Sequence, residues 1–195
     1  MLSTHERFAK QLPIVWSAKR QQPIQYQQIY VRGQFFSKIL LLDNQHYRHQ
    51  FGYHVLSPLQ LDNGKVILVD RGWLVGDITR QKLPLVDTPS GWVIVRGSAY
   101  YPAINHWNLG QLIEKEQGDT VVVELIDTKL ISQFLHKSIY PFIIRLGALE
   151  SGGYVRDWAI VAMPPQRHYA YALQWFVMAL VVLIIFIALT FKKKT

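Results

Sequence analysis

Three side chains near the end of the sequence have types and spacing that could bind a ligand. His168, Tyr171 and Trp175 follow one another at intervals of three and four residues. On an α-helix this spacing places them within about 60° of arc. An imidazole beside two aromatic rings suits an amphipathic planar macrocycle that carries a metal, and haem is such a ligand. The same spacing is also typical of an interfacial histidine beside aromatic residues that anchor a helix at a membrane surface.

A second group of imidazoles lies earlier in the chain. His46, His49 and His54 fall within nine residues, and neutral imidazoles bind copper, zinc and haem iron. We expect this segment to be a turn that enters a strand. Because a turn does not hold three ligands in place, the pattern favours surface histidines over a metal site.

The other charged candidates are weaker. Asp70 and Arg71 precede the Gly-Trp pair at 72–73, at the expected end of a strand. They could bind a ligand, but an ion pair that fixes a turn beneath a packed tryptophan is favoured. Glu114 and Glu116 are expected to be solvated charges in a polar loop. Since the sequence contains no nucleophile elbow, phosphate loop, dinucleotide fingerprint or zinc-protease motif, we do not expect an enzyme.

Composition excludes several classes of protein. The 195 residues include no cysteine, which excludes disulfides, zinc–thiolate sites, iron–sulfur clusters and copper carriers built on cysteine. The chain has 21 Lys plus Arg and 13 Asp plus Glu. Three of the lysines lie at positions 192–194, and the remaining basic residues form no continuous track. Nucleic-acid binding is therefore not expected.

An apolar segment carries the first group of candidate residues. Residues 169–191 contain no charged side chain or histidine, and as a helix of about 1.5 Å per residue they reach roughly 34 Å, enough to cross a membrane. Aromatic rings lie at the start of the segment and lysines follow it, as is typical of the two membrane interfaces. We expect residues 169–191 to be a transmembrane helix and residues 192–195 to be a basic cytoplasmic tail.

Charges on the two sides of this segment predict its orientation. Three lysines follow it, whereas Arg156 and Arg167 precede it, and the excess favours a cytoplasmic C-terminus. Residues 1–25 form a polar segment without an apolar run long enough for a signal peptide or a span. Either the domain is cytoplasmic on a C-terminal anchor, or a first span precedes Met1.

Residues 26–168 are predicted to form a β-rich extramembrane domain. Residues 127–137 predict one helix, which Asp127 can cap. Pro141 limits its own strand to a sheet edge or to a strand start. We expect a β-rich α+β fold, in which a mostly antiparallel sheet or barrel-like domain closes over one helix. The predicted strands are 29–35, 38–44, 52–61, 65–74, 92–101, 120–126 and 139–146.

An ordered set of short motifs extends over about residues 26–190. The motifs are LLDNQ (41–45), GYHVLSPLQL (52–61), LVDRGWL (68–74), LP (83–84), P-x-G (89–91), PF-x-x-R (141–145) and RH-x-x-Y-x-x-x-W (167–175). This set resembles the surfeit locus 1 family of cytochrome c oxidase assembly proteins. Ser57 stands where many members have Thr, and Asp70 stands where Asn is usual. Both changes keep the ability to form hydrogen bonds.

The resemblance implies a role in oxidase assembly without catalysis. Family members have two spans with a β-rich domain between them, and they help deliver haem a to oxidase subunit I or insert it there. The resemblance therefore implies transient haem a as cofactor, with subunit I, haem a synthesis and delivery proteins, and the lipid bilayer as partners. The family's haem-binding histidine matches His168, which would ligate the iron. Tyr171 and Trp175 match the neighbouring positions, and Arg167 is expected to pair with a propionate.

These expectations place the protein in the bacterial plasma membrane, with its main domain periplasmic. The family's first span, with its Trp-Gln motif, has no counterpart here, so we expect a truncated or late start. An alternative is a membrane scaffold that stabilises oxidase assembly intermediates and binds no cofactor, which would depend on surface aromatics such as Trp73, Trp92 or Trp107. A copper chaperone that uses the three clustered histidines is less favoured, because Met-rich and Cys motifs are absent.

Overall fold

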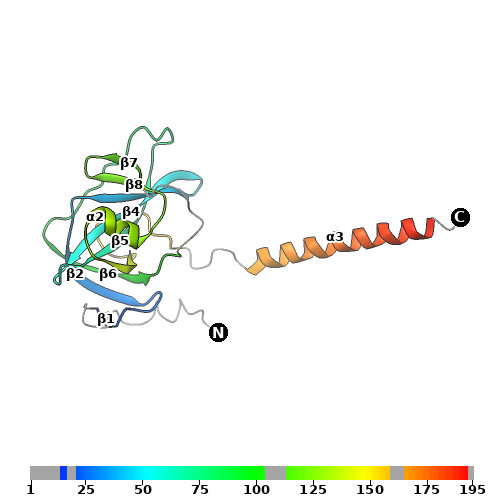
Figure 1. The fold of residues 1–195 in the computed structure, drawn as a ribbon, viewed down its shortest axis with the longest axis horizontal. Helices are drawn as coiled ribbons and strands as arrows, with labels where there is room; N and C mark the ends of the chain where they lie inside the picture. The colour runs from blue at the N-terminus through cyan, green and yellow to red at the C-terminus, as the bar shows by residue number, and fades with distance from the viewer. Residues whose placement is uncertain (1–13, 17–20, 104–112, 159–164, 193–195) are drawn as a thin grey trace. The chain divides into compact units, whose positions relative to one another are not determined.

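The structure is a computed structural model that describes residues 14–16, 21–103, 113–158 and 165–192 (Figure 1). The chain divides into two compact units, Met1–Asp157 and Trp158–Thr195. The first unit is a β-rich domain, and the second contains one long helix, α3 (Pro165–Lys192).

Five strands of the first unit close into a barrel. Their order is β2-β6-β9-β5-β4, and pairing of β2 with β4 completes the ring. At that closure Gly33 pairs with Leu61, and a Cβ at Gly33 would lie 2.5 Å from the Gln60 carbonyl oxygen, so the two strands approach closely there. The sequence-based expectation of a β-rich, barrel-like domain is confirmed. The strands are β2 (Gln28–Phe35), β4 (Gln50–Leu61), β5 (Val66–Val75), β6 (Trp92–Tyr100) and β9 (Ile139–Leu146).

Four further strands extend the sheet on both sides of the barrel. Beyond β4 the order continues with β3 (Ile39–Tyr47), β8 (Thr120–Val123) and β7 (Ile113–Gln117), and β1 (Ile14–Val15) pairs in parallel with β2. The polar loop expected around Glu114 and Glu116 is therefore wrong, because these residues form β7. Its sequence IEKEQ lacks an apolar alternation, and pairing with β8 across a short turn holds it in the sheet.

The barrel interior is filled by apolar side chains from all five barrel strands. Alternate residues point inward, as the period of two in a strand requires. Trp16, just after β1, packs edge-on against Tyr140 and Phe142, with ring centroids 5.0 and 5.3 Å apart. The core of the domain therefore lies inside the barrel. Its buried members are Trp16, Ile29, Val31, Leu59, Leu61, Ile67, Val69, Val95, Ala99, Tyr140, Phe142, Ile144 and Leu146.

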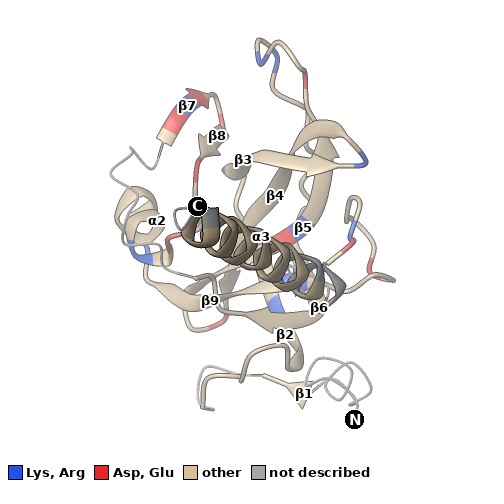
Figure 2. Cartoon of the chain, turned by 90° about the vertical axis from the view of Figure 1, so that its right-hand side faces the viewer, with Lys and Arg blue, Asp and Glu red and all other residues tan. Residues whose placement is uncertain are grey.

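One helix covers part of the outside of this barrel. The helix α2 (Thr128–Leu135) begins where predicted, and the Asp127 carboxylate accepts hydrogen bonds from the amides of Lys129 and Leu130. It packs against β9 (Figure 2). Its buried residue Ile131 joins a second apolar cluster with Leu40, Leu56, Leu68, Val121, Val123 and Ile143.

β5 (Val66–Val75) matches the predicted strand 65–74, but Asp70 and Arg71 lie within it and not at its end. β9 is not at a sheet edge, since it pairs with β5 and β6. Pro141 nevertheless lies near the start of β9, where pairing with β5 is irregular, and the strand-start alternative therefore applies.

The helix α3 matches the predicted apolar segment. Its part Tyr171–Phe191 has 21 residues and a mean hydropathy of 2.8, and it is the one helix of the described residues that is long and apolar enough to cross a membrane. Pro165 occupies the first position, where a proline is tolerated because that amide has no helical partner. The Thr190 hydroxyl donates to the Phe186 carbonyl at 2.8 Å, so this polar group is satisfied within the helix.

Candidate functional site

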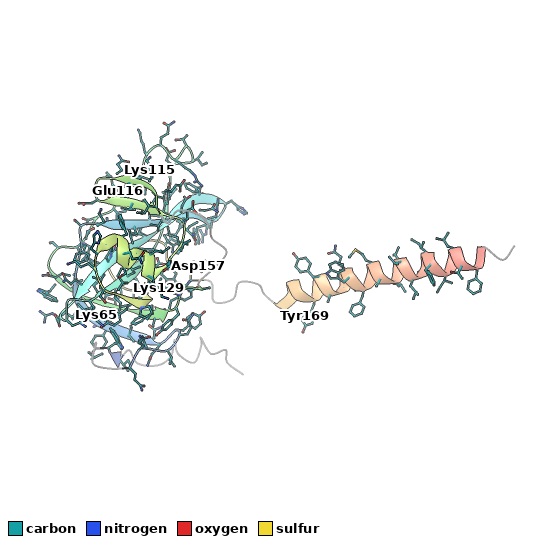
Figure 3. All side chains as sticks on the ribbon, viewed as in Figure 1. Lys65, Lys115, Glu116, Lys129, Asp157 and Tyr169 are labelled. Atoms are coloured by element: carbon teal, nitrogen blue, oxygen red, sulfur yellow. The ribbon has the colours of Figure 1, made fainter. Side chains whose placement is uncertain are left out.

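The four predicted binding residues all lie on α3. The helix is continuous from Pro165 to Lys192, so positions 167, 168, 171 and 175 fall within about 100° of arc on one side. Tyr171 is 53% exposed and Trp175 is 70% exposed. The side chains of Arg167 and His168 lie outside the described residues. Figure 3 labels Tyr169, whose ring is also exposed, near the start of the same helix.

This side of α3, which we call the α3 aromatic face, combines one imidazole, two aromatic rings and one guanidinium. Helix α3 contains no Asp or Glu, so no carboxylate of the helix competes for the basic groups. Exposed aromatic rings can cover the flat apolar surface of a macrocycle, an imidazole can ligate its metal, and a guanidinium can pair with its carboxylates. The residue types present at these positions therefore fit haem.

The three clustered histidines do not converge on one point. His46 lies on β3 and His49 in the turn that follows, and both are exposed. His54 lies on β4 and is half-buried. Among the described residues, no group of three His, Asp or Glu side chains is arranged to hold a metal ion. The prediction of surface histidines is confirmed for His46 and His49 and is wrong for His54.

His54 contacts the buried carboxylate of Asp70, for which the sequence predicted an ion pair with Arg71. Its Nδ1 lies 3.1 Å from each carboxylate oxygen of Asp70, which is 3% exposed and also accepts a hydrogen bond from the Gly72 amide. The predicted Asp70–Arg71 ion pair is therefore wrong. Neighbouring residues in a strand point to opposite faces, so Asp70 lies on the outside of the barrel and Arg71 on the inside.

Arg71 is 3% exposed at one end of the barrel. Its Nε donates to the Gly152 carbonyl at 2.7 Å, and its guanidinium carbon lies 5.2 Å from the Tyr154 ring centre and 5.8 Å from that of Phe35. Burial lowers the pKa of Arg71 below its usual value. A cavity of about 90 Å³ adjoins it, but the acidic Glu150 lines the same cavity. The contacts assign Arg71 a structural role, which is to hold the segment after β9 against β5.

Gly72 and Trp73 have a similar role. Gly72 has φ of +108°, and a Cβ there would lie 2.6 Å from the Val155 carbonyl oxygen. Trp73 exchanges backbone hydrogen bonds with Val155, and its indole N–H donates to the Gln45 carbonyl at 3.1 Å. The DRGW sequence (70–73), part of the family resemblance, thus joins β5 to β3 and to residues 152–155.

A charged group near β7 was not predicted as a site. Asp43 is buried on β3, and its Oδ2 lies 2.8 Å from Nη1 of Arg80, which is 3.6 Å from Glu114. Burial and the charge of Asp43 raise the pKa of Glu114. These residues and Glu124 line an open cavity of about 350 Å³. The alternating charges of residues 113–117 are the sequence signal that could have identified this strand edge.

Comparison with known proteins gives one clear result. A model of the SURF1 family matches residues 2–180, which include the whole β-rich domain and the α3 aromatic face. A comparison with curated proteins found no match.

Proposed function

The chain belongs to the SURF1 family, and we propose that it helps deliver haem a to the catalytic subunit of cytochrome c oxidase, or insert it there, while anchored in a membrane by α3. The family is linked to cytochrome c oxidase assembly. Haem supplies an iron atom with open axial positions and two propionates. The role of this chain is to bind and release the ligand, and no catalysis is assigned to it.

The arrangement on α3 carries this proposal. Position 168 precedes the exposed rings of Tyr171 and Trp175 by one and two helical turns. His168 donates one nitrogen to the iron, the two rings cover the macrocycle, and Arg167 pairs with a propionate. A carrier must also release its cargo, and a single axial imidazole at the edge of a helix suits weak, reversible binding.

The properties of α3 support the proposed membrane anchoring. Tyr171–Phe191 is apolar, with a mean hydropathy of 2.8. Exposed Leu, Ile, Val and Phe side chains on every side of a helix favour a lipid environment over water. Aromatic rings at the start of the span favour the headgroup layer, and we propose that the haem site lies at that depth.

The substitution His168→Ala tests the haem site. Purified from membranes of cells that make haem a, the variant is expected to lose most of the bound pigment, because the nitrogen ligand is removed. The absorption spectrum and the haem content per chain measure this loss. His46→Ala is the matched control, since His46 is an exposed histidine on a different element. An unchanged Soret band in His168→Ala would remove His168 from the proposed role.

A second candidate function is a scaffold that holds oxidase subunits and binds no cofactor. One observation favours it, since Trp92 is 49% exposed on the domain surface. The other two aromatics give it no support, because Trp73 is buried and Trp107 lies outside the described residues. A wild-type protein without pigment, which still associates with oxidase subunits, would favour the scaffold.

A further inference from the structure

One outer face of the barrel exposes apolar side chains, whereas α2 packs against β9. Strand register places Val15 beside Tyr30, Tyr30 beside Arg96, and Arg32 beside Ile94. Trp92 lies two residues from Ile94 on the same side of β6. We use the name β1–β2–β6 face for six of the outward residues of these three strands, which are Val15, Tyr30, Arg32, Trp92, Ile94 and Arg96. Gln34, which pairs with Trp92, lies on the same side.

The exposure of this face is unusual for its residue types. Ile94 is 58% exposed, Val15 is 50% exposed and Trp92 is 49% exposed. The strand β6 begins WVIV, so it is apolar on both sides, although only Val93 and Val95 point toward the barrel interior. A sheet with one solvated face normally alternates apolar and polar residues. Apolar residues gathered on the outer side indicate a surface that meets a partner.

Charge on the same face defines the chemistry of that partner. Arg32 and Arg96 are its charged residues, and the three strands contain no Asp or Glu. The Arg32 guanidinium carbon lies 4.8 Å from the ring centre of Trp92. Nη1 of Arg96 lies 4.0 Å from Oε1 of Glu150, which follows β9 in the chain. Tryptophan and aliphatic side chains with arginines between them match the interface of a membrane that carries anionic phosphate headgroups.

We propose that the β1–β2–β6 face docks on an anionic lipid surface. This inference rests on the proposed anchoring of the chain by α3. Asp157, the last residue of the β-rich unit, precedes the first residue of α3 by eight positions. Because a tether keeps the domain at a high effective concentration next to the membrane, modest affinity is enough for docking.

The absence of cysteine makes a site-specific test direct. Ile94→Cys in the full chain is labelled with an environment-sensitive fluorophore and reconstituted in nanodiscs of phosphatidylcholine, with or without phosphatidylglycerol. Lys129→Cys is the matched control, because Lys129 (labelled in Figure 3) is exposed on α2, which packs against β9 and not against β1, β2 or β6. In anionic discs we expect the label at 94 to shift to the blue and to be quenched by nitroxide lipids. The label at 129 is expected to remain unquenched.

Removal of the two arginine charges tests the proposal quantitatively. One arginine near an anionic surface changes partitioning roughly fivefold, so Arg32→Gln with Arg96→Gln is expected to lower the ratio of docked to undocked domain roughly 25-fold in anionic discs. Equal quenching at 94 and 129 would overturn the proposal. So would quenching at 94 that is the same in neutral and anionic discs, and so would a blue shift without nitroxide quenching, which would indicate a protein partner.

The failure of docking can be distinguished from the failure of the proposed function. If α3 does not anchor the chain, the protein does not incorporate into nanodiscs at all. If only docking fails, incorporation and bound haem are unchanged while the label at 94 stays in water.

Discussion

Two outer faces of the same barrel differ in how far their apolar side chains are exposed. Under α2, Leu68 and Ile143 are fully buried against Ile131. On the β1–β2–β6 face, Ile94 and Trp92 remain about half exposed. The difference arises because the connection between β8 and β9 contains α2, whereas residues 76–91, which connect β5 with β6, contain no helix. The covered face therefore contributes to the stability of the domain, and the exposed face is the one for which we propose a lipid partner.

The largest expected effect is at the covered face, beneath α2. Ile131→Ala removes a fully buried side chain from the cluster beneath α2, and we expect it to lower the free energy of unfolding by about 2–5 kcal/mol. The control, Ile94→Ala on the exposed face, is expected to change it by less than about 0.5 kcal/mol. Denaturant unfolding in detergent, followed by tryptophan fluorescence, measures both. Equal losses would show that the two faces are equivalent for stability.

A medium effect is expected at Asp70, a buried carboxylate on the outer side of β5. Asp70→Ala removes the carboxylate that accepts from the Gly72 amide and contacts His54. Because a buried amide then lacks its acceptor, we expect a loss of about 1–3 kcal/mol. Asp70→Asn keeps an acceptor oxygen and is expected to cost less. If thermal unfolding gives the same loss of stability for Asp70→Ala and Asp70→Asn, the hydrogen bonds that this carboxylate accepts do not explain its contribution to stability.

The smallest expected effect concerns the charged end of the sheet at β7. Since burial and Asp43 raise the pKa of Glu114, folding favours its protonated form. Stability from this group is present below the usual pKa of glutamate, and it is lost as the pH rises through the higher pKa of the folded state. Glu114→Gln is expected to flatten this dependence and to stabilise the protein slightly at neutral pH. The effect stays below about 1 kcal/mol because the side chain is partly solvated.

Melting temperatures of wild type and Glu114→Gln between pH 4 and 8 measure this difference. Glu116→Gln on the same strand is the control, because Glu116 instead pairs with Lys38 at 2.8 Å. A larger pH dependence in Glu114→Gln than in wild type would contradict the assigned direction.

Local patterns explain which elements could be predicted. The β-branched runs of β6 and β9 and the cap of α2 depend on neighbouring residues, and their positions were predicted closely. The strand β7 was missed because its residues show no apolar period. The backbone pairing of Trp73 with Val155 could not be predicted from a local pattern, because the two residues lie more than eighty positions apart in sequence.

The amino-acid sequence alone determined the apolar helix and the order of residues along its aromatic face, because helical periodicity repeats within a few residues. The tertiary structure decided that Asp70 contacts His54, that Arg71 holds a loop, and that Ile94 is exposed while Ile143 is covered. The physical reason is that strand pairing is non-local. Which side of a strand becomes interior depends on the partners that close the barrel, and their identity is not contained in the local pattern of the strand.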